Sequence, residues 1–282
     1  MTQDAWLRTH PYLQTVSSLH AQVDKVASEL SVVTALAPRW ENYIADFLDG
    51  VPLLRSSAPI DLAPVEVQAR ALIKRLASSS LPGNMAEEAR ILDAELNCES
   101  DPQRRVTDWL LDGSAFASEC PGLLRYVGWT VMARYLLPLT DAFRTWRDEE
   151  QWLRNYCPTC GSLPSMAQLI GADQGRQRLL SCACCRTVWR YRRTGCPFCE
   201  NEDDRHLAVV KVEGEGGLRI DYCQSCKGYL KTYDGEGSET VLLADWTSIH
   251  LDVIACDRGL KRLAASLYDL PPLPYCSATA TC

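Results

Sequence analysis

The stretch SCACCRTVWRYRRTGCPFC, residues 181–199, holds five cysteines within nineteen residues. It belongs to a series of four pairs in which two residues separate the cysteines: Cys157/Cys160, Cys182/Cys185, Cys196/Cys199 and Cys223/Cys226. A turn of this kind holds both sulfurs on one side of a tight knuckle, where they can bind one metal ion. Cys184 is then the extra cysteine, because Cys182 and Cys185 share the spacing of the other pairs.

The distances between the pairs along the chain predict how they combine. Twenty-one residues separate Cys160 from Cys182 and 23 separate Cys199 from Cys223, but only 10 separate Cys185 from Cys196. The long gaps fit a hairpin between two knuckles, and the short gap fits a connector. We therefore predict two four-cysteine metal sites: site 1, with Cys157, Cys160, Cys182 and Cys185, and site 2, with Cys196, Cys199, Cys223 and Cys226. Four thiolates suit zinc or a mononuclear iron of rubredoxin type, and spacing does not choose between these metals.

The composition is that of an ordinary globular protein. The chain has 282 residues, 46% hydrophobic and 23% charged, enough for two domains. We see neither a secretory signal nor a run of about 20 apolar residues, so we expect a cytoplasmic protein without membrane insertion. Thiols stay reduced in the cytoplasm, which favours metal binding over disulfides for clustered cysteines.

Residues 1–150 predict an α-helical, bundle-like domain. Apolar residues from Val16 to Val33 recur at steps of three and four, and residues 65–76 repeat the pattern. The stretch 121–139 is apolar on most faces, which predicts a central helix. Nine of the fourteen cysteines follow within residues 151–235, so the change in composition places a domain boundary near residue 150.

Alternating segments between the knuckles predict β-hairpins. Residues 162–182 hold two such segments around a turn, and residues 206–223 hold two more around a glycine-rich turn. Further short strands are expected at 228–235 and 239–245. The predicted fold is α+β, with a helical domain (1–150), a first four-cysteine ribbon (151–193), a second ribbon (194–245), and a C-terminal helix with a mobile tail (246–282).

Seven arginines and a single acidic residue, Asp173, lie between Arg154 and Arg193. These arginines can offset the negative charge of four thiolates around a divalent metal, or they can bind an acidic partner. Arginine and tryptophan are both enriched at the centres of protein interfaces. Both interpretations stay open, and the candidate partner-binding residues are Trp189, Arg190, Arg192 and Arg193.

The stretch from Tyr156 to Lys231 resembles the formate dehydrogenase accessory protein family, known as FdhE. The resemblance rests on YCPTCGSLP (156–164), on Cys182, Cys185 and Trp189 spaced as C-x-x-C-x-x-x-W, on CPFC (196–199) and on YCQSCKGYLK (222–231). The later stretch LDVIACDRG (251–259) is similar to the family's C-terminal part. The extra Cys184 and the ending LPYCSATATC depart from the family pattern.

The resemblance implies a cytoplasmic protein with a helical N-terminal part and rubredoxin-like ribbons that bind iron. It implies that the eight paired cysteines are the ligands of two mononuclear sites. It also implies a partner, the catalytic subunit of respiratory formate dehydrogenase, a molybdenum selenoprotein that is bound before its export. The oligomeric state stays unknown.

Two other classes of function are open. A zinc-ribbon nucleic-acid-binding protein would use the arginines, but the net charge of −7 opposes phosphate binding. A rubredoxin-like electron carrier, or a thiol enzyme acting through Cys184, would use the cysteines. We expect a non-catalytic protein, because His206 and His250 have no Ser, Asp or Cys partner at a recognisable motif spacing. Cys276 and Cys282 are expected to be incidental thiols.

Overall fold

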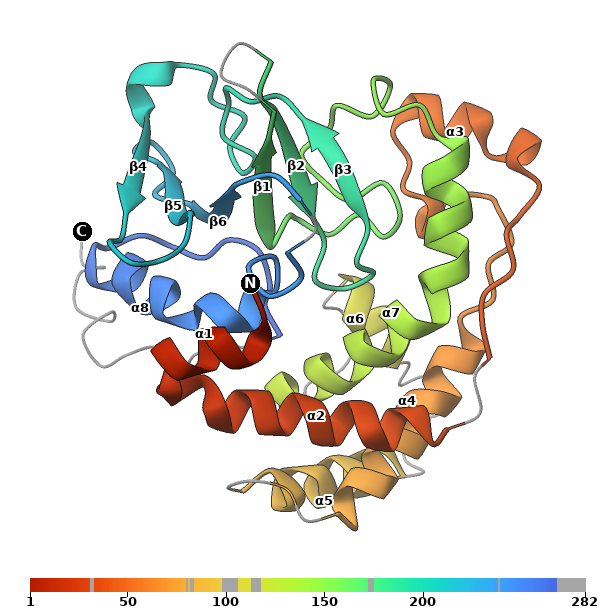
Figure 1. The fold of residues 1–282 in the computed structure, drawn as a ribbon. Helices are drawn as coiled ribbons and strands as arrows, with labels where there is room; N and C mark the ends of the chain where they lie inside the picture. Colours follow the sequence, from red (N-terminus) through yellow and green to blue (C-terminus); the bar gives the residue numbers. More distant parts are fainter. Residues whose placement is uncertain are drawn as a thin grey trace, which may run out of the picture. The chain divides into compact units, whose positions relative to one another are not determined.

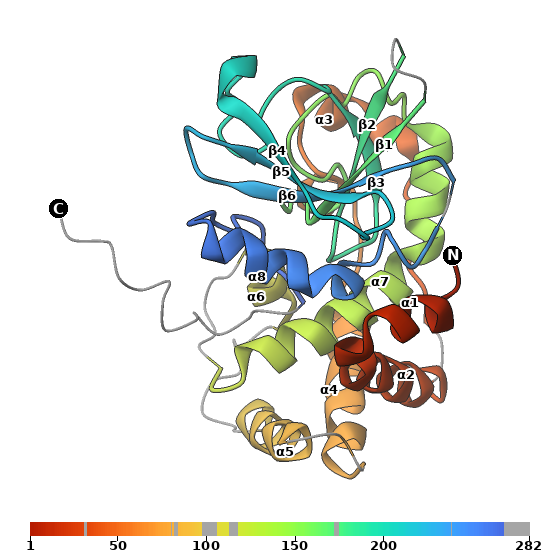
Figure 2. The same cartoon turned by 60° about the vertical axis from the view of Figure 1, so that its left-hand side comes forward.

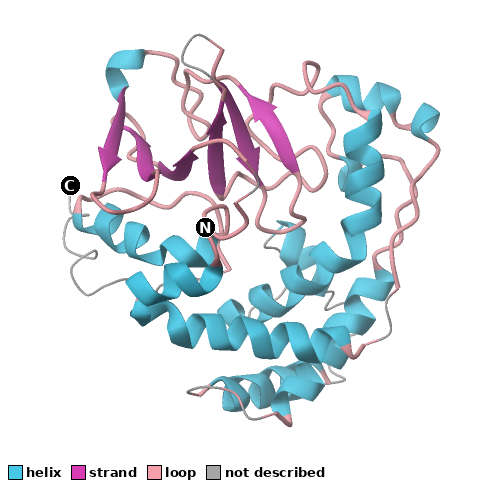
Figure 3. Ribbon diagram, viewed as in Figure 1, coloured by secondary structure: helices cyan, strands magenta, loops and turns pink. Residues whose placement is uncertain are grey.

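The computed structural model describes residues 1–30, 33–79, 81, 84–97, 106–112, 118–171, 175–237 and 239–267. The chain divides into two compact units. The sheet unit comprises Met1–Gln3, Ala45–Leu53 and Asp148–Cys282, and the helical unit comprises Asp4–Ile44 and Leu54–Arg147. The helices of the N-terminal half and the strands of the C-terminal half confirm the predicted α+β class (Figures 1 and 3).

The helical unit is organised around a long apolar helix. Its helices are α1 (Gln3–Thr9), α2 (Gln14–Ser28), α4 (Ala63–Ala77), α5 (Met85–Leu96), α6 (Val106–Asp112) and α7 (Pro121–Trp146). Helix α7 buries residues along most of its length, as its apolar sequence predicts, and α4 packs against it. The stripe from Val16 predicts too long a helix, because α2 ends at Ser28 and Val33 is exposed. No helix in the described ranges is both long and apolar enough to span a bilayer.

The two predicted ribbons lie in one continuous sheet. Its strands are β1 (Met166–Ile170), β2 (Gln177–Ser181), β3 (Val188–Tyr191), β4 (Leu207–Lys211), β5 (Leu218–Cys223) and β6 (Tyr229–Asp234). The spatial order is β3-β2-β1-β6-β5-β4. Pairing is antiparallel within each ribbon, and the parallel pair β1–β6 joins the ribbons (Figure 1). The boundary predicted at residue 193 therefore separates two halves of one sheet.

Segments on either side of the ribbons complete the sheet unit. Helix α3 (Ile44–Asp49) lies before them in the chain, and α8 (Ile249–Asp257) packs below the sheet in both views (Figures 1 and 2). The strand predicted at 239–245 is wrong, because this segment forms a turn that leads into the 3-10 helix η5 (Asp245–Ser248). The predicted mobile tail, with Cys276 and Cys282, lies outside the described residues beyond position 267.

Candidate metal centres

Four copies of one turn carry the paired cysteines. In each copy the backbone N–H of the first cysteine donates to the carbonyl oxygen five residues later, at 2.9, 3.0, 2.9 and 2.9 Å for Cys157, Cys182, Cys196 and Cys223. This bond closes a tight loop that turns the two sulfurs toward the same side. The shared geometry assigns Cys182 and Cys185 to the second knuckle and excludes Cys184 from it.

The residue after each second cysteine has a left-handed backbone conformation, with φ values of 82° at Gly161, 62° at Arg186, 58° at Glu200 and 60° at Lys227. Glycine adopts this conformation freely, but a side chain makes it cost about 1–2 kcal/mol. Among the described residues, the non-glycine residues with positive φ are Arg186, Glu200 and Lys227. Strain that persists at three equivalent positions indicates that the cysteine geometry must be kept.

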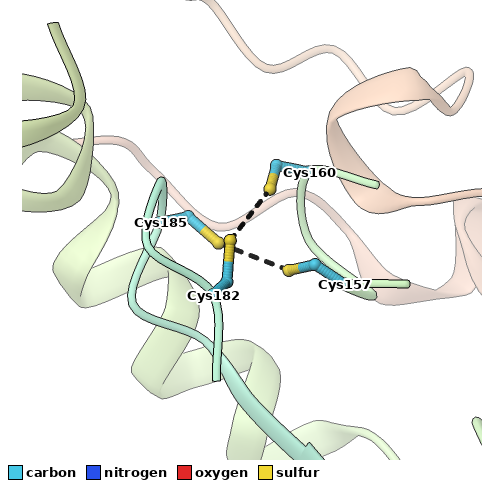
Figure 4. Close-up of side chains that lie close together, drawn as sticks. All are labelled: Cys157, Cys160, Cys182 and Cys185. Carbon is cyan, nitrogen blue, oxygen red and sulfur yellow. Dashed lines mark hydrogen bonds between the residues drawn. The ribbon is translucent and has the colours of Figure 1, made fainter. Parts of the chain in front are cut away.

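At site 1 the four sulfurs converge from two knuckles (Figure 4). The Sγ atoms of Cys157 and Cys185 lie 3.4 Å apart, as do those of Cys160 and Cys182, and all four lie within 4.8 Å of one another. Sulfurs bonded at about 2.3 Å to one tetrahedral ion would be about 3.8 Å apart. The four cysteines, none in a disulfide, therefore fit a single ion.

Site 2 has the same form. The Sγ atoms of Cys196 and Cys226 lie 3.7 Å apart, and those of Cys199 and Cys223 lie 3.8 Å apart, close to the tetrahedral spacing. Burial raises the pKa of the Cys223 thiol, but the backbone N–H groups of Cys226 and Ser225 and the neighbouring Cys199 outweigh burial and lower it to about 7. A thiolate is thus accessible near neutral pH, as metal binding requires.

The two sites differ in their exposure to solvent. All four cysteines of site 1 are buried, whereas at site 2 Cys199 is exposed and Cys226 is half-buried. The segment Ala45–Leu53 covers the first knuckle: the N–H of Leu53 donates to the Pro158 carbonyl at 2.9 Å, and the Tyr156 hydroxyl donates to the Gly50 carbonyl at 2.8 Å. Site 2 therefore offers a metal ion, or a reagent, the easier approach.

The extra cysteine, Cys184, is completely buried beside site 1. Its hydrogen bond with Cys160, together with burial, raises the pKa of the Cys184 thiol well above its ordinary value. A buried, protonated thiol is a poor nucleophile. This environment argues against a thiol enzyme that acts through Cys184.

The predicted partner surface around the arginines is partly wrong. Trp189 is fully buried, and its indole N–H donates to the Arg154 carbonyl at 3.0 Å, so its ring cannot face a partner. Arg190 forms an ion pair with Glu150, and Arg192 forms one with Glu202. Acidic residues of the same unit therefore already neutralise two of the predicted surface charges.

His206 has partners that the sequence did not indicate. Its Nδ1 atom lies 2.9 Å from the Ser225 hydroxyl, and its Nε2 atom lies 3.8 Å from the Asp203 carboxylate. Such a constellation suggests hydrolysis only if the carboxylate orients the imidazole. Asp203 instead accepts three hydrogen bonds from the Arg205 guanidinium, at 2.9, 3.2 and 2.7 Å. The group therefore has the contacts of a surface ion-pair cluster.

Sequence reasoning also missed a buried ionic cluster between the sheet and the C-terminal segment. Lys231 on β6 is 1% exposed, and its Nζ atom lies 2.7 Å from Asp252 on α8 and 2.6 Å from Asp245. Arg262 forms ion pairs with Asp245 at 2.7 Å and with Asp252 at 2.8 Å. The Tyr229 hydroxyl donates to Asp252 at 2.7 Å. The two stretches YCQSCKGYLK and LDVIACDRG thus meet through Lys231 and Asp252.

The fold and these sites define a class of protein: a helical unit accompanied by a twin ribbon sheet with two four-cysteine centres. No family model matches the chain. A protein named FdhE homolog from Aquifex aeolicus is 34% identical over 134 residues, covering 46% of this chain and 47% of that protein. One from Stutzerimonas stutzeri is 30% identical over 208 residues, covering 68% and 63%. The chain spans about half the length of the curated relatives it matches.

A solved structure shares the fold over most of the chain. The crystal structure of the FdhE protein from Pseudomonas aeruginosa matches with a TM-score of 0.60 and 24% identity, over 91% of this chain and 88% of that one. The match shows a shared fold, and the curated relatives show that the chain is similar to proteins named FdhE homolog.

Proposed function

We propose that the protein is a non-catalytic accessory protein for the maturation of respiratory formate dehydrogenase in the cytoplasm. The observation that carries this proposal is the pair of four-cysteine centres in one FdhE-like sheet. The helical unit, the buried cysteines and the family resemblance all suit a protein that holds another protein during assembly. Its proposed partner is the catalytic subunit of the formate dehydrogenase.

Both sites are proposed to bind iron, with zinc as the alternative metal. Cys157, Cys160, Cys182 and Cys185 would hold one ion, and Cys196, Cys199, Cys223 and Cys226 would hold the other. A bound ion would cross-link two knuckles and so contribute folding free energy, on the order of 10 kcal/mol for structural sites of this kind. The hydroxyl groups of Ser162 and Thr187, 3.3 and 3.1 Å from Cys160 and Cys185, would donate to thiolates of site 1.

Affinity capture tests the proposal. The tagged full chain, expressed in its own host under anaerobic growth with formate, should enrich the formate dehydrogenase catalytic subunit. A variant with Cys157→Ser and Cys223→Ser, which disrupts both sites, is the control. In a strain that lacks the gene, formate-dependent dye reduction by membranes should fall strongly. Unchanged activity in that strain, without capture of the subunit, would contradict the proposal.

A rubredoxin-like electron carrier is a second candidate, because the exposed Cys199 brings site 2 close to solvent. Reversible reduction of the bound metal at a defined potential, with turnover by a physiological donor, would support it. Zinc in both sites would exclude it. The ion-paired Arg190 and Arg192 weaken the case for a nucleic-acid-binding protein.

A further inference from the structure

The two edge strands of the sheet differ in what contacts their outward-facing backbone groups. At the β3 edge, the backbone N–H of Arg190 donates to the Glu149 carboxylate at 3.2 Å, so a side chain occupies an outward-facing donor. At the other edge, β4 is the last strand of the described sheet (Figure 1). An open strand edge is a template for an added strand, and proteins usually cover or charge it.

The register shows which groups of β4 face outward. The N–H of Gln224 donates to the His206 carbonyl at 2.7 Å, and β4 pairs with β5 from Leu207↔Cys223 to Lys211↔Arg219. Because hydrogen-bonded pairs alternate along an antiparallel ladder, Ala208 and Val210 bond to β5. The N–H and C=O groups of Leu207, Val209 and Lys211 therefore point away from the sheet. The N–H of Leu207 donates to the Asp204 carbonyl at the end of the preceding 3-10 turn, Asp204–His206. No group in the described part of the chain is seen to bond the outward groups of Val209 and Lys211.

A cavity of about 250 Å³ lies along this edge. Three consecutive residues of β4, Leu207 to Val209, line it, although neighbouring side chains on a strand point to opposite faces. Asp221, Tyr222 and Cys223 of the neighbouring strand β5 line it as well, so the cavity lies beside β4 and extends over the adjacent strands. Leu169, Leu230 and the site 2 residues Cys196 and Cys223 also line it, and Val209 is 47% exposed.

One buried donor in the lining of the cavity lacks an acceptor. Arg178 is only 8% exposed. One of its terminal nitrogens donates to the Gly195 carbonyl at 3.0 Å, but its buried Nε has no hydrogen-bond partner. The charged residues Arg193, Asp204, Arg219 and Asp221 also line the cavity. Arg219 donates to Asp221 at 2.8 Å and to Asp234 at 2.6 Å, and the Nη2 of Arg178 lies 3.8 Å from Asp221. The buried Nε of Arg178 is therefore the donor that a further carboxylate would satisfy.

We propose that the β4 edge and this cavity bind an extended segment of the partner polypeptide. The segment adds as a strand to β4, through the outward groups of Val209 and Lys211, and places an acidic side chain opposite Arg178. Main-chain bonds along an edge give affinity and a side-chain pocket gives selectivity in this mode of recognition. The inference rests on the proposed function, since it locates the site for the formate dehydrogenase catalytic subunit.

A backbone-directed substitution tests the edge. Val209→Pro removes an outward N–H that does not bond to β5, and edge strands tolerate proline at such positions. Val209→Thr keeps the N–H and the branched shape and is the matched control. With the metal-loaded full chain, Val209→Pro should capture the catalytic subunit at least tenfold more weakly, and Val209→Thr should stay within twofold of wild type. Metal content should be unchanged in both.

Hydrogen exchange of the wild-type complex gives a second readout that needs no variant. The outward amides of Val209 and Lys211 should gain protection when the subunit binds, while the β3 edge should not. Capture without protection of β4 would overturn the docking site and leave the proposed function intact. A wild-type chain that captures no subunit would overturn both. A dimer that Val209→Pro dissociates in the absence of partner would assign the edge to a second copy of the chain and contradict the proposal.

Discussion

Removal of the Lys231 ammonium should destabilise the sheet unit by about 3–5 kcal/mol, the usual cost of breaking a buried ion pair. Lys231→Met would leave Asp245, Asp252 and Arg262 buried with one uncompensated negative charge. At about 2–4 °C per kcal/mol for a unit of this size, the melting temperature should fall by about 6–20 °C. Lys211→Met, on the exposed end of β4, is the control and should change stability by less than about 0.5 kcal/mol.

The assay follows metal release to a chromophoric chelator as urea is raised, which reports on the sheet unit whichever metal is bound. Asp252→Asn in the Lys231→Met background restores charge balance and should recover part of the loss. If Lys231→Met is as stable as Lys211→Met, the ionic cluster does not stabilise the unit as argued. The same conclusion follows if the effects of Lys231→Met and Asp252→Asn on stability are additive.

The same cluster predicts a pH dependence. Burial alone would raise the pKa of Asp245, but Lys231 and Arg262 hold it below its ordinary value. A depressed carboxyl pKa stabilises the fold above the unfolded value of about 3.9 and loses that contribution as pH falls. Urea midpoints should therefore drop below about pH 4, and this acid-side drop should be smaller in Lys231→Met.

The remaining predictions concern the metal centres. Site 2 should release its metal to a chelator at least tenfold faster than site 1, because Cys199 is exposed; two phases of equal rate would contradict this difference. Cys184→Ser should leave the metal content unchanged, since the knuckle uses its neighbours, and a loss equal to that in Cys185→Ser would show a wrong register. Gly161→Ala should destabilise site 1 by about 1 kcal/mol, and Arg186→Gly should stabilise it by a similar amount, because both positions have a left-handed backbone conformation. If both substitutions shift the urea midpoint equally and in the same direction, this explanation is refuted.

The cysteine pairs could be combined from sequence because their spacing is local and metal geometry is rigid. The structure brings the same eight residues together in the same two sets. The hairpins were likewise predictable from short alternating segments. Spacing also predicts the register within CACC, and the left-handed Arg186 and the bond from the Cys182 N–H to the Thr187 carbonyl agree with it.

The parts that sequence reasoning missed depend on contacts between distant segments. The parallel pairing of β1 with β6 joins residues more than sixty positions apart, and no local pattern predicts it. From the sequence alone, Lys231 is expected to be a surface residue. Only the fold brings Asp245 and Asp252 beside it. Alternation along β3 separates Trp189 from Arg190 but does not say which face is buried, and so the predicted partner surface includes Trp189, which is buried.

Metal analysis tests the central claim, that the chain carries two four-cysteine metal centres, most directly. Protein purified without added metal should contain close to two equivalents of iron plus zinc per chain. Cys157→Ser and Cys223→Ser should each retain close to one equivalent, and the double variant should retain none. One equivalent in the wild type, or the loss of both metals from either single variant, would contradict two independent centres.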